Sequence, residues 1–520
     1  MELKILNISK RRVAFELINN SAYYSPEKYK LFLNGEYIKD IENNVFSINQ
    51  LKPDKKYELQ LKDSLGEKLI SKVNFETEVE YVKLNVKKFG AKGNGESDDT
   101  LSIQTAIMSC PKNSTVYIPE GVYSVKSILL KDNITIELDK NAIIKGTKVR
   151  ENLSILPGFI ETTDEKDEYY LGSWEGNPLD TYTSIITGIN VQNVKFIGEG
   201  TIDGNASKED WWFDAKKKRG AWRPRTISLI NCENIVFEGI KITNSPCWTV
   251  HPFFSKQLKF INMKIYNPDD SPNTDGIDPE SCENVEIVGT KISVGDDCIA
   301  IKSGKIYLGK KLKKPTTNMS VRNCYMERGH GAVVIGSEIA GGVNNIKIEK
   351  CIFFNTDKGL RIKTRRGRGK DSVLSEISCE NTEMNEVKAP FVINSFYFCD
   401  PDGKSNYVGS KEVIPVDERT PSIGNIYFKN IKCENAHISA AFICGLPEKK
   451  IENLLVENVY ISFSEEALAD YPAMMLNCEK VKKQGFYVEN VEKLTIKNLT
   501  IKDFIGEKII KNNIEEANID

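Results

Sequence analysis

From about residue 190 onward, the chain repeats one short pattern of alternating strands. Each unit has a polar residue, usually Asn, then an alternating apolar stretch, a small or polar corner, and a second alternating stretch. Examples are NVKFIGEGTIDG (193–204), NIVFEGIKITNS (234–245) and NVEIVGTKISVG (284–295). Repeats of this length are typical of solenoids. Because the alternation has period 2 and the residues are often β-branched, the pattern predicts a β-solenoid rather than a helical repeat, with a propeller as the alternative.

Residues 1–82 are predicted to form a separate small β domain ahead of this solenoid, which would take residues 83–520. The chain has 520 residues, more than one domain usually holds. Short alternating runs such as KYKLFL, VFSI and YELQLK are separated by turn signals. Within them, LKPDKKYELQL (51–61) resembles the tyrosine corner of a fibronectin type III sandwich, with Tyr57 as the corner residue.

Composition excludes several classes of function. The formal net charge is −2, so no basic field for nucleic acid is expected. No apolar run is long enough to span a membrane and no secretory leader is visible, which predicts a cytoplasmic protein. A processed, secreted chain would have the same appearance. Twelve cysteines occur without a CxxC pair, which indicates buried, reduced thiols rather than a zinc site or a disulfide scaffold.

Two Asp-Asp pairs occur in the chain, and their surroundings differ. Asp98 and Asp99 precede a helical pattern, so we expect them to cap that helix. Asp296 and Asp297 instead interrupt the buried strand pattern ISVGDDCIAIKSG (292–304). A lone pair of this kind would be interpreted as an acidic surface turn. Adjacent strand residues point to opposite faces, so both can serve one site only where the chain bends, and Gly295 is predicted to supply that bend.

Polar intrusions occur in four consecutive units and are expected to stack on one wall of the solenoid. They are SPNTDGID (271–278), VGDD (294–297), RGHGAVVIGSE (328–338) and KGLRIKTRRGRG (358–369). Adjacent strands lie only about 4.8 Å apart, so these units can bring distant residues together. The resulting set of carboxylates, imidazole and cations is Asp275, Asp296, Asp297, His330, Arg361 and Lys363. One carboxylic acid can protonate a glycosidic oxygen, a second carboxylate can activate water, and cations can hold sugar carboxylates. The set therefore favours cleavage of an anionic polysaccharide.

The motifs NTD (273–275), GDD (295–297), GHG (329–331) and RIK (361–363), in this order, resemble the signatures of the polygalacturonase family, glycoside hydrolase family 28. The resemblance covers roughly residues 86–510, beginning with FGAKGNGESDDT. It implies an all-β, right-handed parallel β-helix and hydrolysis with inversion, without a cofactor or metal. Asp296 would be the general acid, and Asp275 with Asp297 would activate water. His330 would tune the acid. Gln often replaces Gly295 in the family, a difference expected to be harmless.

The resemblance also implies how substrate is held. Arg361 and Lys363 would bind galacturonate carboxylates, and Asn273 and Lys302 are further candidates for substrate binding. Two weaker candidates are His251 and Tyr397, for which a packed core aromatic or a corner residue is an equal alternative. The arginines beside the RIK motif could hold terminal carboxylates of short substrates, or form a solvated basic loop. They are Arg365, Arg366 and Arg368.

Two long segments, 148–187 and 389–423, could wall off one end of the cleft. Together with the N-terminal domain, they predict an enzyme that works from a chain end, similar to bacterial exopolygalacturonases. The expected partner is a galacturonate oligosaccharide or polysaccharide, with no nucleic acid or membrane. Rhamnogalacturonan and xylogalacturonan stay open as substrates. A calcium-dependent pectate lyase and a non-catalytic carbohydrate-binding β-helix are the competing classes.

Overall fold

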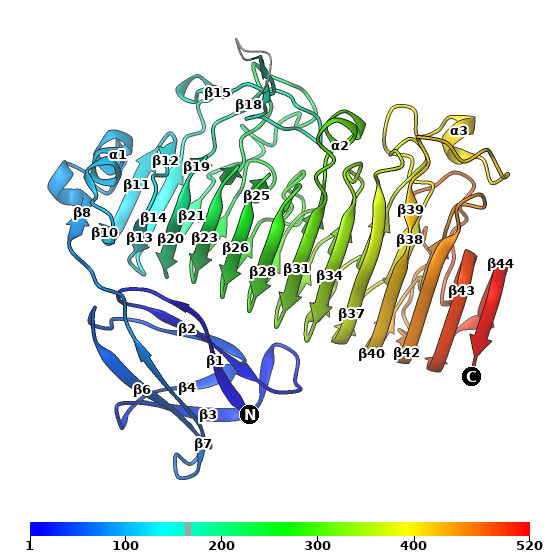
Figure 1. The fold of residues 1–520 in the computed structure, drawn as a ribbon, viewed down its shortest axis with the longest axis horizontal. Coiled ribbons are helices and arrows are strands. Elements are labelled where there is room, and N and C mark those ends of the chain that lie inside the picture. The colour runs from blue at the N-terminus through cyan, green and yellow to red at the C-terminus, as the bar shows by residue number, and fades with distance from the viewer. Residues whose placement is uncertain (162–167) are drawn as a thin grey trace.

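A computed structural model describes residues 1–161 and 168–520 (Figure 1). Part of the long segment 148–187 falls between these ranges and lies outside the described residues. Two antiparallel sheets form the N-terminal domain, one in the order β1-β2-β5 and one in the order β4-β3-β6-β7. Their strands are β1 (Glu2–Ile8), β2 (Val13–Ile18), β3 (Tyr24–Leu33), β4 (Glu36–Asn43), β5 (Val45–Ile48), β6 (Lys56–Lys62) and β7 (Leu69–Glu76).

The two sheets pack face to face around one core that includes Phe15, Tyr29 and Leu59. This packing makes the domain a β-sandwich. The backbone N–H of Lys52 donates to the Tyr57 hydroxyl at 2.9 Å, which is the bond that defines a tyrosine corner. The fibronectin type III resemblance itself stays a prediction.

The rest of the chain winds into a parallel β-helix with three sheets. The first holds β8 (Lys83–Asn85), β10 (Ser114–Ile118), β13 (Ile134–Leu138), β20 (Gln192–Gly198), β23 (Glu233–Glu238), β26 (Lys256–Ile261), β28 (Glu283–Val288), β31 (Thr316–Arg322), β34 (Val343–Glu349), β37 (Val373–Asn385), β40 (Asn425–Ala436), β42 (Ile451–Phe463), β43 (Gln484–Lys502) and β44 (Ile505–Ile519). The second holds β9 (Asn94–Asp98), β11 (Gly121–Val125), β14 (Ala142–Gly146), β21 (Thr201–Asp203), β24 (Lys241–Thr243), β27 (Lys264–Tyr266), β29 (Lys291–Ser293), β32 (Tyr325–Arg328) and β35 (Ile352–Phe354).

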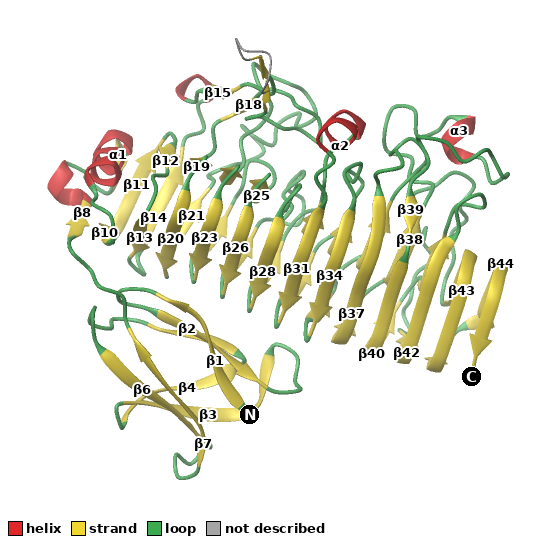
Figure 2. Cartoon of the chain, in the orientation of Figure 1, coloured by secondary structure: helices red, strands yellow, loops and turns green. Residues whose placement is uncertain are grey.

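The third sheet carries the loops and the site described below. Its strands are β12 (Ile128–Leu129), β19 (Ile186–Ile189), β22 (Ile227–Ile230), β25 (Val250–Phe253), β30 (Asp297–Ile301), β33 (Gly331–Ile335), β36 (Lys358–Lys363), β38 (Ala389–Asn394) and β41 (Ser439–Cys444). The remaining elements are β15 (Ile155–Leu156), β16 (Ile160–Glu161), β17 (Glu168–Tyr169), β18 (Thr181–Tyr182), β39 (Ser422–Ile423), α1 (Thr100–Ser109), α2 (Ile306–Leu312), α3 (Asn406–Gly409) and the 3₁₀ turns η1 (Val86–Phe89) and η2 (Arg150–Asn152). Most of the long loops gather along one side of the rod (Figure 2).

The repeated asparagines explain how the coils turn. Asn193, Asn234, Asn318 and Asn345 all have φ between 55° and 58°, a left-handed conformation that Asn tolerates better than most residues. Their side chains also bond from coil to coil, with Asn234 to Asn193 and Asn345 to Asn318 both at 2.7 Å. Each repeat unit therefore begins at a corner that a polar ladder stabilises.

Apolar side chains stack in register inside the coils. Phe196, Phe237 and Phe260 occupy one position in three successive coils, with ring centroids 5.4 and 6.0 Å apart. The cysteines found in register in the sequence, such as Cys324 and Cys351, are buried free thiols in the same core. The fold expected from period 2 is confirmed, because these positions alternate with outward polar residues.

The first Asp-Asp pair is structural, although the two side chains act differently. Asp98 accepts a hydrogen bond from the Thr100 backbone at 3.0 Å at the start of α1. Asp99 makes no cap bond and instead accepts from the backbone N–H groups of Lys92 and Gly93, at 2.6 and 2.9 Å. Asp99 thus fixes the loop that leads into the first coil.

The N-terminal domain packs against the outer face of the first sheet, on the side of the rod away from the long loops (Figure 1). The buried Glu238 of β23 is the polar anchor. It contacts Arg12 Nε at 2.7 Å, Asn7 Nδ2 at 2.7 Å and Ser47 Oγ at 2.8 Å. A small apolar cluster that includes Val45 and Val288 surrounds this anchor. Among the described residues, the helices are all too short or too polar to cross a membrane.

Candidate active site

Three carboxylates meet where the second sheet passes into the third. One oxygen each of Asp275, Asp296 and Asp297 can be chosen so that all lie within 4.8 Å of one another. Backbone pairing sets this proximity, since Gly276 N–H donates to the Asp297 carbonyl at 3.0 Å and His330 N–H donates to the Asp296 carbonyl at 2.9 Å. The stacking predicted from the intrusions is therefore what brings the acids together.

Asp296 lies in a bend between β29 and β30, while Asp297 is the first residue of β30. This bend lets two adjacent residues face one site, as expected. Gly295 lies in this bend, as predicted, although its φ is not in the left-handed region. Glycine is also required there for space, since a Cβ would collide with the carbonyl oxygens of Ser271 and Pro268. A larger residue at 295 is not harmless in this chain.

Two cations keep Asp297 ionised. Lys363 Nζ donates to Asp297 Oδ2 at 2.9 Å, and both side chains are buried. Burial alone would raise the pKa of Asp297, but Lys363 and then Arg361 outweigh it and hold that pKa below its usual value. Asp297 Oδ1 has no hydrogen-bond partner among the described residues, which leaves a free acceptor in the site. Arg361 and Lys363 also lie 5.9 and 5.6 Å from the ring centre of Tyr397.

His330 faces Asp296 from the next coil. Its Nδ1 lies 3.3 Å from Asp296 Oδ1, and the ring is exposed. The hydrogen bond to Asp296 raises the pKa of His330 to about 9, so the imidazole is cationic at neutral pH and donates to the carboxylate. His330 is thus placed beside the proposed acid, as the sequence predicted.

Asp275 belongs to a buried network behind the site. Burial, followed by the charges of Asp278 and Asp296, raises the pKa of Asp275. Lys302 Nζ lies 3.8 Å from Asp275, 3.6 Å from Asp278 and 3.4 Å from Glu338. Lys302 is buried against these carboxylates, and its contact with substrate stays a prediction. The sequence analysis missed Asp278 and Glu338, although both stand inside the quoted motifs SPNTDGID and RGHGAVVIGSE.

Two further predicted substrate contacts have other partners. His251 is buried, its Nε2 lies 2.8 Å from Glu280 Oε2, and burial lowers its pKa to about 4. This burial favours the packed core aromatic that the sequence left as an equal alternative, and the subsite contact stays a prediction. Asn273 is half-buried and accepts from Arg223 at 2.7 Å, which positions the loop that ends at Asp275.

The arginines after the RIK motif do not form a solvated loop. Arg366 is fully buried and pairs with Glu448, while Arg365 and Arg368 lie 3.1 and 2.7 Å from Asp400. The solvated basic loop predicted as one alternative was therefore wrong, because acids distant in sequence pair with these charges. Their binding of terminal carboxylates stays a prediction. Part of the 389–423 segment also proves regular, since β38 and β39 belong to the coils and only 395–421 is a long loop.

The two long segments meet at Lys305, just before α2. The Lys305 N–H donates to the Gly176 carbonyl at 2.8 Å, and Lys305 Nζ lies 3.7 Å from Glu175 of the first segment. The same Nζ lies 3.0 Å from Asp400 of the second segment. Gly176 leaves no space for a Cβ against Glu338, which itself pairs with Lys302. The first segment therefore reaches the network that supports Asp275.

The arrangement suits acid-base chemistry. Three clustered carboxylates could also hold a divalent cation, and calcium prefers six to eight oxygen ligands. Here, however, Lys363 already contacts Asp297, and the cationic His330 contacts Asp296. A parallel β-helix with such a set on its wall defines a polysaccharide-cleaving β-helix enzyme.

Comparison with known proteins identifies the family. Residues 110–482 match the model described as Glycosyl hydrolases family 28, and this chain belongs to that family. It is 29% identical over 391 residues to a probable polygalacturonase of Vitis vinifera, covering 73% of this chain and 74% of that protein. It is 30% identical over 316 residues to an endo-polygalacturonase of Pectobacterium carotovorum subsp. carotovorum, covering 58% and 73%. Its fold is similar to that of a Yersinia enterocolitica family 28 exopolygalacturonase, with a TM-score of 0.76, 19% identity, and 99% and 98% coverage.

Proposed function

We propose that this glycoside hydrolase cleaves the α-1,4 bonds of polygalacturonate and oligogalacturonides. Family membership and the polygalacturonase names of the similar proteins support the substrate class. The observation that carries the proposal is the state of Asp297. Lys363 and Arg361 keep it ionised, while Asp297 Oδ1 is free to accept a proton from water beside Asp275 and Asp296.

The chemistry divides among the three acids. Asp296, in its protonated form, donates a proton to the leaving glycosidic oxygen, with His330 fixing its orientation. Asp297 accepts the proton of the attacking water, and Asp275, whose pKa is raised, orients that water. Arg361 and Lys363 flank Tyr397 and are placed to hold the carboxylate of the sugar.

Inversion of the anomeric centre is part of the proposal, and it is the part with the sharpest test. Inverting enzymes usually separate their carboxyl groups by about 6.5–9.5 Å to leave space for water. The oxygens here come within 4.8 Å, so the spacing by itself does not support inversion. With two acids to hold the water, the attack can still come from the face opposite Asp296. NMR of the first product formed decides: the β-anomer supports inversion, and the α-anomer refutes it.

We further propose that cleavage proceeds from a chain end. The junction at Lys305 supports this mode, because both long segments close over the same side of the catalytic network. The similar proteins include both endo- and exopolygalacturonases, so the mode rests on this junction.

The deciding experiment is product analysis on polygalacturonate with and without EDTA. Saturated monomer or dimer formed equally with EDTA supports the proposal. Unsaturated ends that depend on calcium would mean a lyase, and no products would favour a binding protein. Parallel incubations with rhamnogalacturonan and xylogalacturonan test the two remaining substrates.

A further inference from the structure

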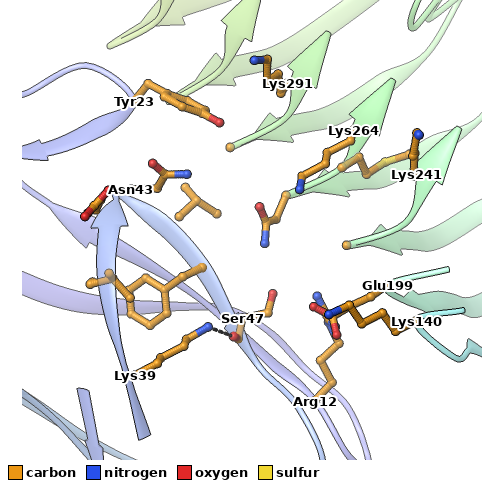
Figure 3. Close-up of a pocket in the computed structure, with 18 of the residues that line it drawn as sticks. Arg12, Tyr23, Lys39, Asn43, Ser47, Lys140, Glu199, Lys241, Lys264 and Lys291 are labelled. Carbon is orange, nitrogen blue, oxygen red and sulfur yellow. Dashed lines mark hydrogen bonds between the residues drawn. The ribbon is translucent and has the colours of Figure 1, made fainter. Parts of the chain in front are cut away.

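A cavity of about 670 Å³ lies between the N-terminal domain and the β-helix. Figure 3 shows Lys241, Lys264 and Lys291 of the β-helix on one side and Tyr23, Lys39 and Ser47 of the N-terminal domain on the other. Seven basic and three acidic side chains line this cavity. It is therefore an electropositive pocket, separate from the catalytic acids.

The lysines of the β-helix form a ladder. Lys241, Lys264 and Lys291 are the first residues of β24, β27 and β29 and lie directly opposite one another in neighbouring parallel strands. Like charges placed in this way destabilise a sheet. Among the described residues, Lys241 and Lys264 have no carboxylate within 4.0 Å, whereas Lys291 pairs with Glu327 at 3.1 Å. Two of the three stacked lysines, Lys241 and Lys264, thus have no ion-pair partner among the described residues.

In the adjoining first sheet, by contrast, lysines lie opposite glutamates in the neighbouring strands. Lys256 of β26 lies opposite Glu233 and Glu283 in the flanking strands, and its Nζ is 3.2 Å from Glu233. Lys259 likewise lies opposite Glu286 at 3.6 Å. The same coils therefore alternate charges outside the pocket and stack one charge inside it.

The N-terminal domain lines the pocket with three cations, Arg12, Lys28 and Lys39, and with two carboxylates, Asp40 and Glu42. Lys39 Nζ donates to the Ser47 carbonyl at 2.7 Å and has no carboxylate within 4.0 Å among the described residues. Arg12 reaches the pocket while paired with Glu238. Among the acids that line the pocket, Asp40 lies with Lys28 at 3.3 Å, so it does not neutralise the ladder.

We propose that this pocket is a second carbohydrate-binding site, which holds successive carboxylates of an anionic oligosaccharide. The ligand class rests on the proposed function, since a polyuronide is the anion that the enzyme would meet. A polyuronide carries one carboxylate on every sugar ring, so cations repeated at the strand spacing of about 4.8 Å suit it better than they suit a single small anion.

The pocket lies near the active site but is distinct from it. Lys291 is the first residue of the short strand β29, which ends at Ser293, and Asp296 follows three residues later, five residues from Lys291. Extended chain of this length spans at most about 18 Å. A polymer held in the pocket would therefore remain close to the catalytic cleft of the same coil.

The test is titration calorimetry with tetragalacturonate, carried out on the Asp296→Asn protein so that the ligand is not consumed. Adding Lys241→Gln and Lys264→Gln should remove one binding event, and rising salt should weaken that same event in the parent. The matched control is Lys497→Gln, an exposed strand lysine of β43 far from the pocket, which should leave the isotherm unchanged.

An isotherm that the Lys241→Gln/Lys264→Gln change does not alter overturns the inference. Lysine-dependent binding of inorganic phosphate as tight as that of tetragalacturonate overturns it as well, since the site would then lack selectivity for a polyuronide. Hydrolysis of polygalacturonate by the wild type is measured in parallel. Hydrolysis without the lysine-dependent event refutes only the second site, whereas the event without hydrolysis refutes only the proposed function.

Discussion

Replacing Lys305 by Ala should loosen the junction of the two long segments, which we propose closes one end of the cleft, and allow cuts within the polymer. Lys305 Nζ lies 3.0 Å from Asp400 and 3.7 Å from Glu175, so one side chain holds both long segments. At an effective dielectric constant of about 20, the Coulomb attraction of the closer pair is about 5 kcal/mol. Desolvation cancels most of it, and a hydrogen bond between charged groups contributes about 1.5–3 kcal/mol net.

The pair with Glu175 adds little. The Glu175 side chain is 49% exposed, and such pairs are worth about 0.2–1 kcal/mol. Asp400 keeps Arg365 and Arg368 as partners, so the variant leaves no uncompensated buried charge. A loss of about 2–3 kcal/mol shifts the balance between closed and open segments roughly 30- to 160-fold.

The assay follows viscosity against reducing ends on polygalacturonate. The wild type should release ends while viscosity persists, and Lys305→Ala should lower viscosity at an earlier extent of cleavage. Lys310→Ala, an exposed lysine of α2, is the matched control and should behave like the wild type. Limited proteolysis between residues 170 and 180 reports whether the first segment has loosened. Loosened segments with unchanged products, or an early viscosity collapse in the wild type, would refute the reasoning.

Three other predictions concern the chemistry itself. Changing Asp275, Asp296 or Asp297 singly to Asn should nearly abolish turnover and leave the circular dichroism spectrum unchanged. Double variants should be no less active than single ones, because the three acids act as one unit. Arg361→Ala and Lys363→Ala should raise KM for galacturonides. Lys363→Ala should also lower kcat, because Asp297 loses its partner at 2.9 Å. An unchanged KM in both variants would place the sugar carboxylate elsewhere. The urea midpoint of His330→Asn should be lower than that of the wild type below about pH 6.5, and this difference should vanish as pH rises through about 9. The reason is that a raised pKa stabilises the fold only while the group is protonated. A difference in urea midpoints that stays constant across that range would contradict the prediction.

Local rules explain why so much of the fold was predictable. Alternation of apolar and polar residues with period 2 indicates a β-strand, and the Asn at the start of each unit marks a left-handed corner. The β-helix could therefore be predicted from the repeat. The register of the repeat then placed Asp275, Asp297 and His330 on neighbouring coils, because each coil advances by one strand spacing. Those residues could be predicted without any coordinates.

Partners supplied by segments far away in sequence could not be predicted in this way. The sequence around Arg366 does not predict that it pairs with Glu448. Likewise, the sequence around Lys305 does not predict its contacts with Gly176 and Asp400. The identity of a residue states what charge it carries, but only the folded chain decides which charge faces it.

The sequence by itself determined the β-helix, the order of the catalytic motifs and the acids that they bring together, because short-range periodicity and strand spacing fix these features. Only the tertiary structure decided that His251 and Lys302 are buried and that Gly295 is required for space. It also decided that the long segments meet at Lys305 and that a lysine ladder faces the N-terminal domain. Burial and ion pairing depend on contacts between coils, loops and domains, and no local pattern encodes those contacts.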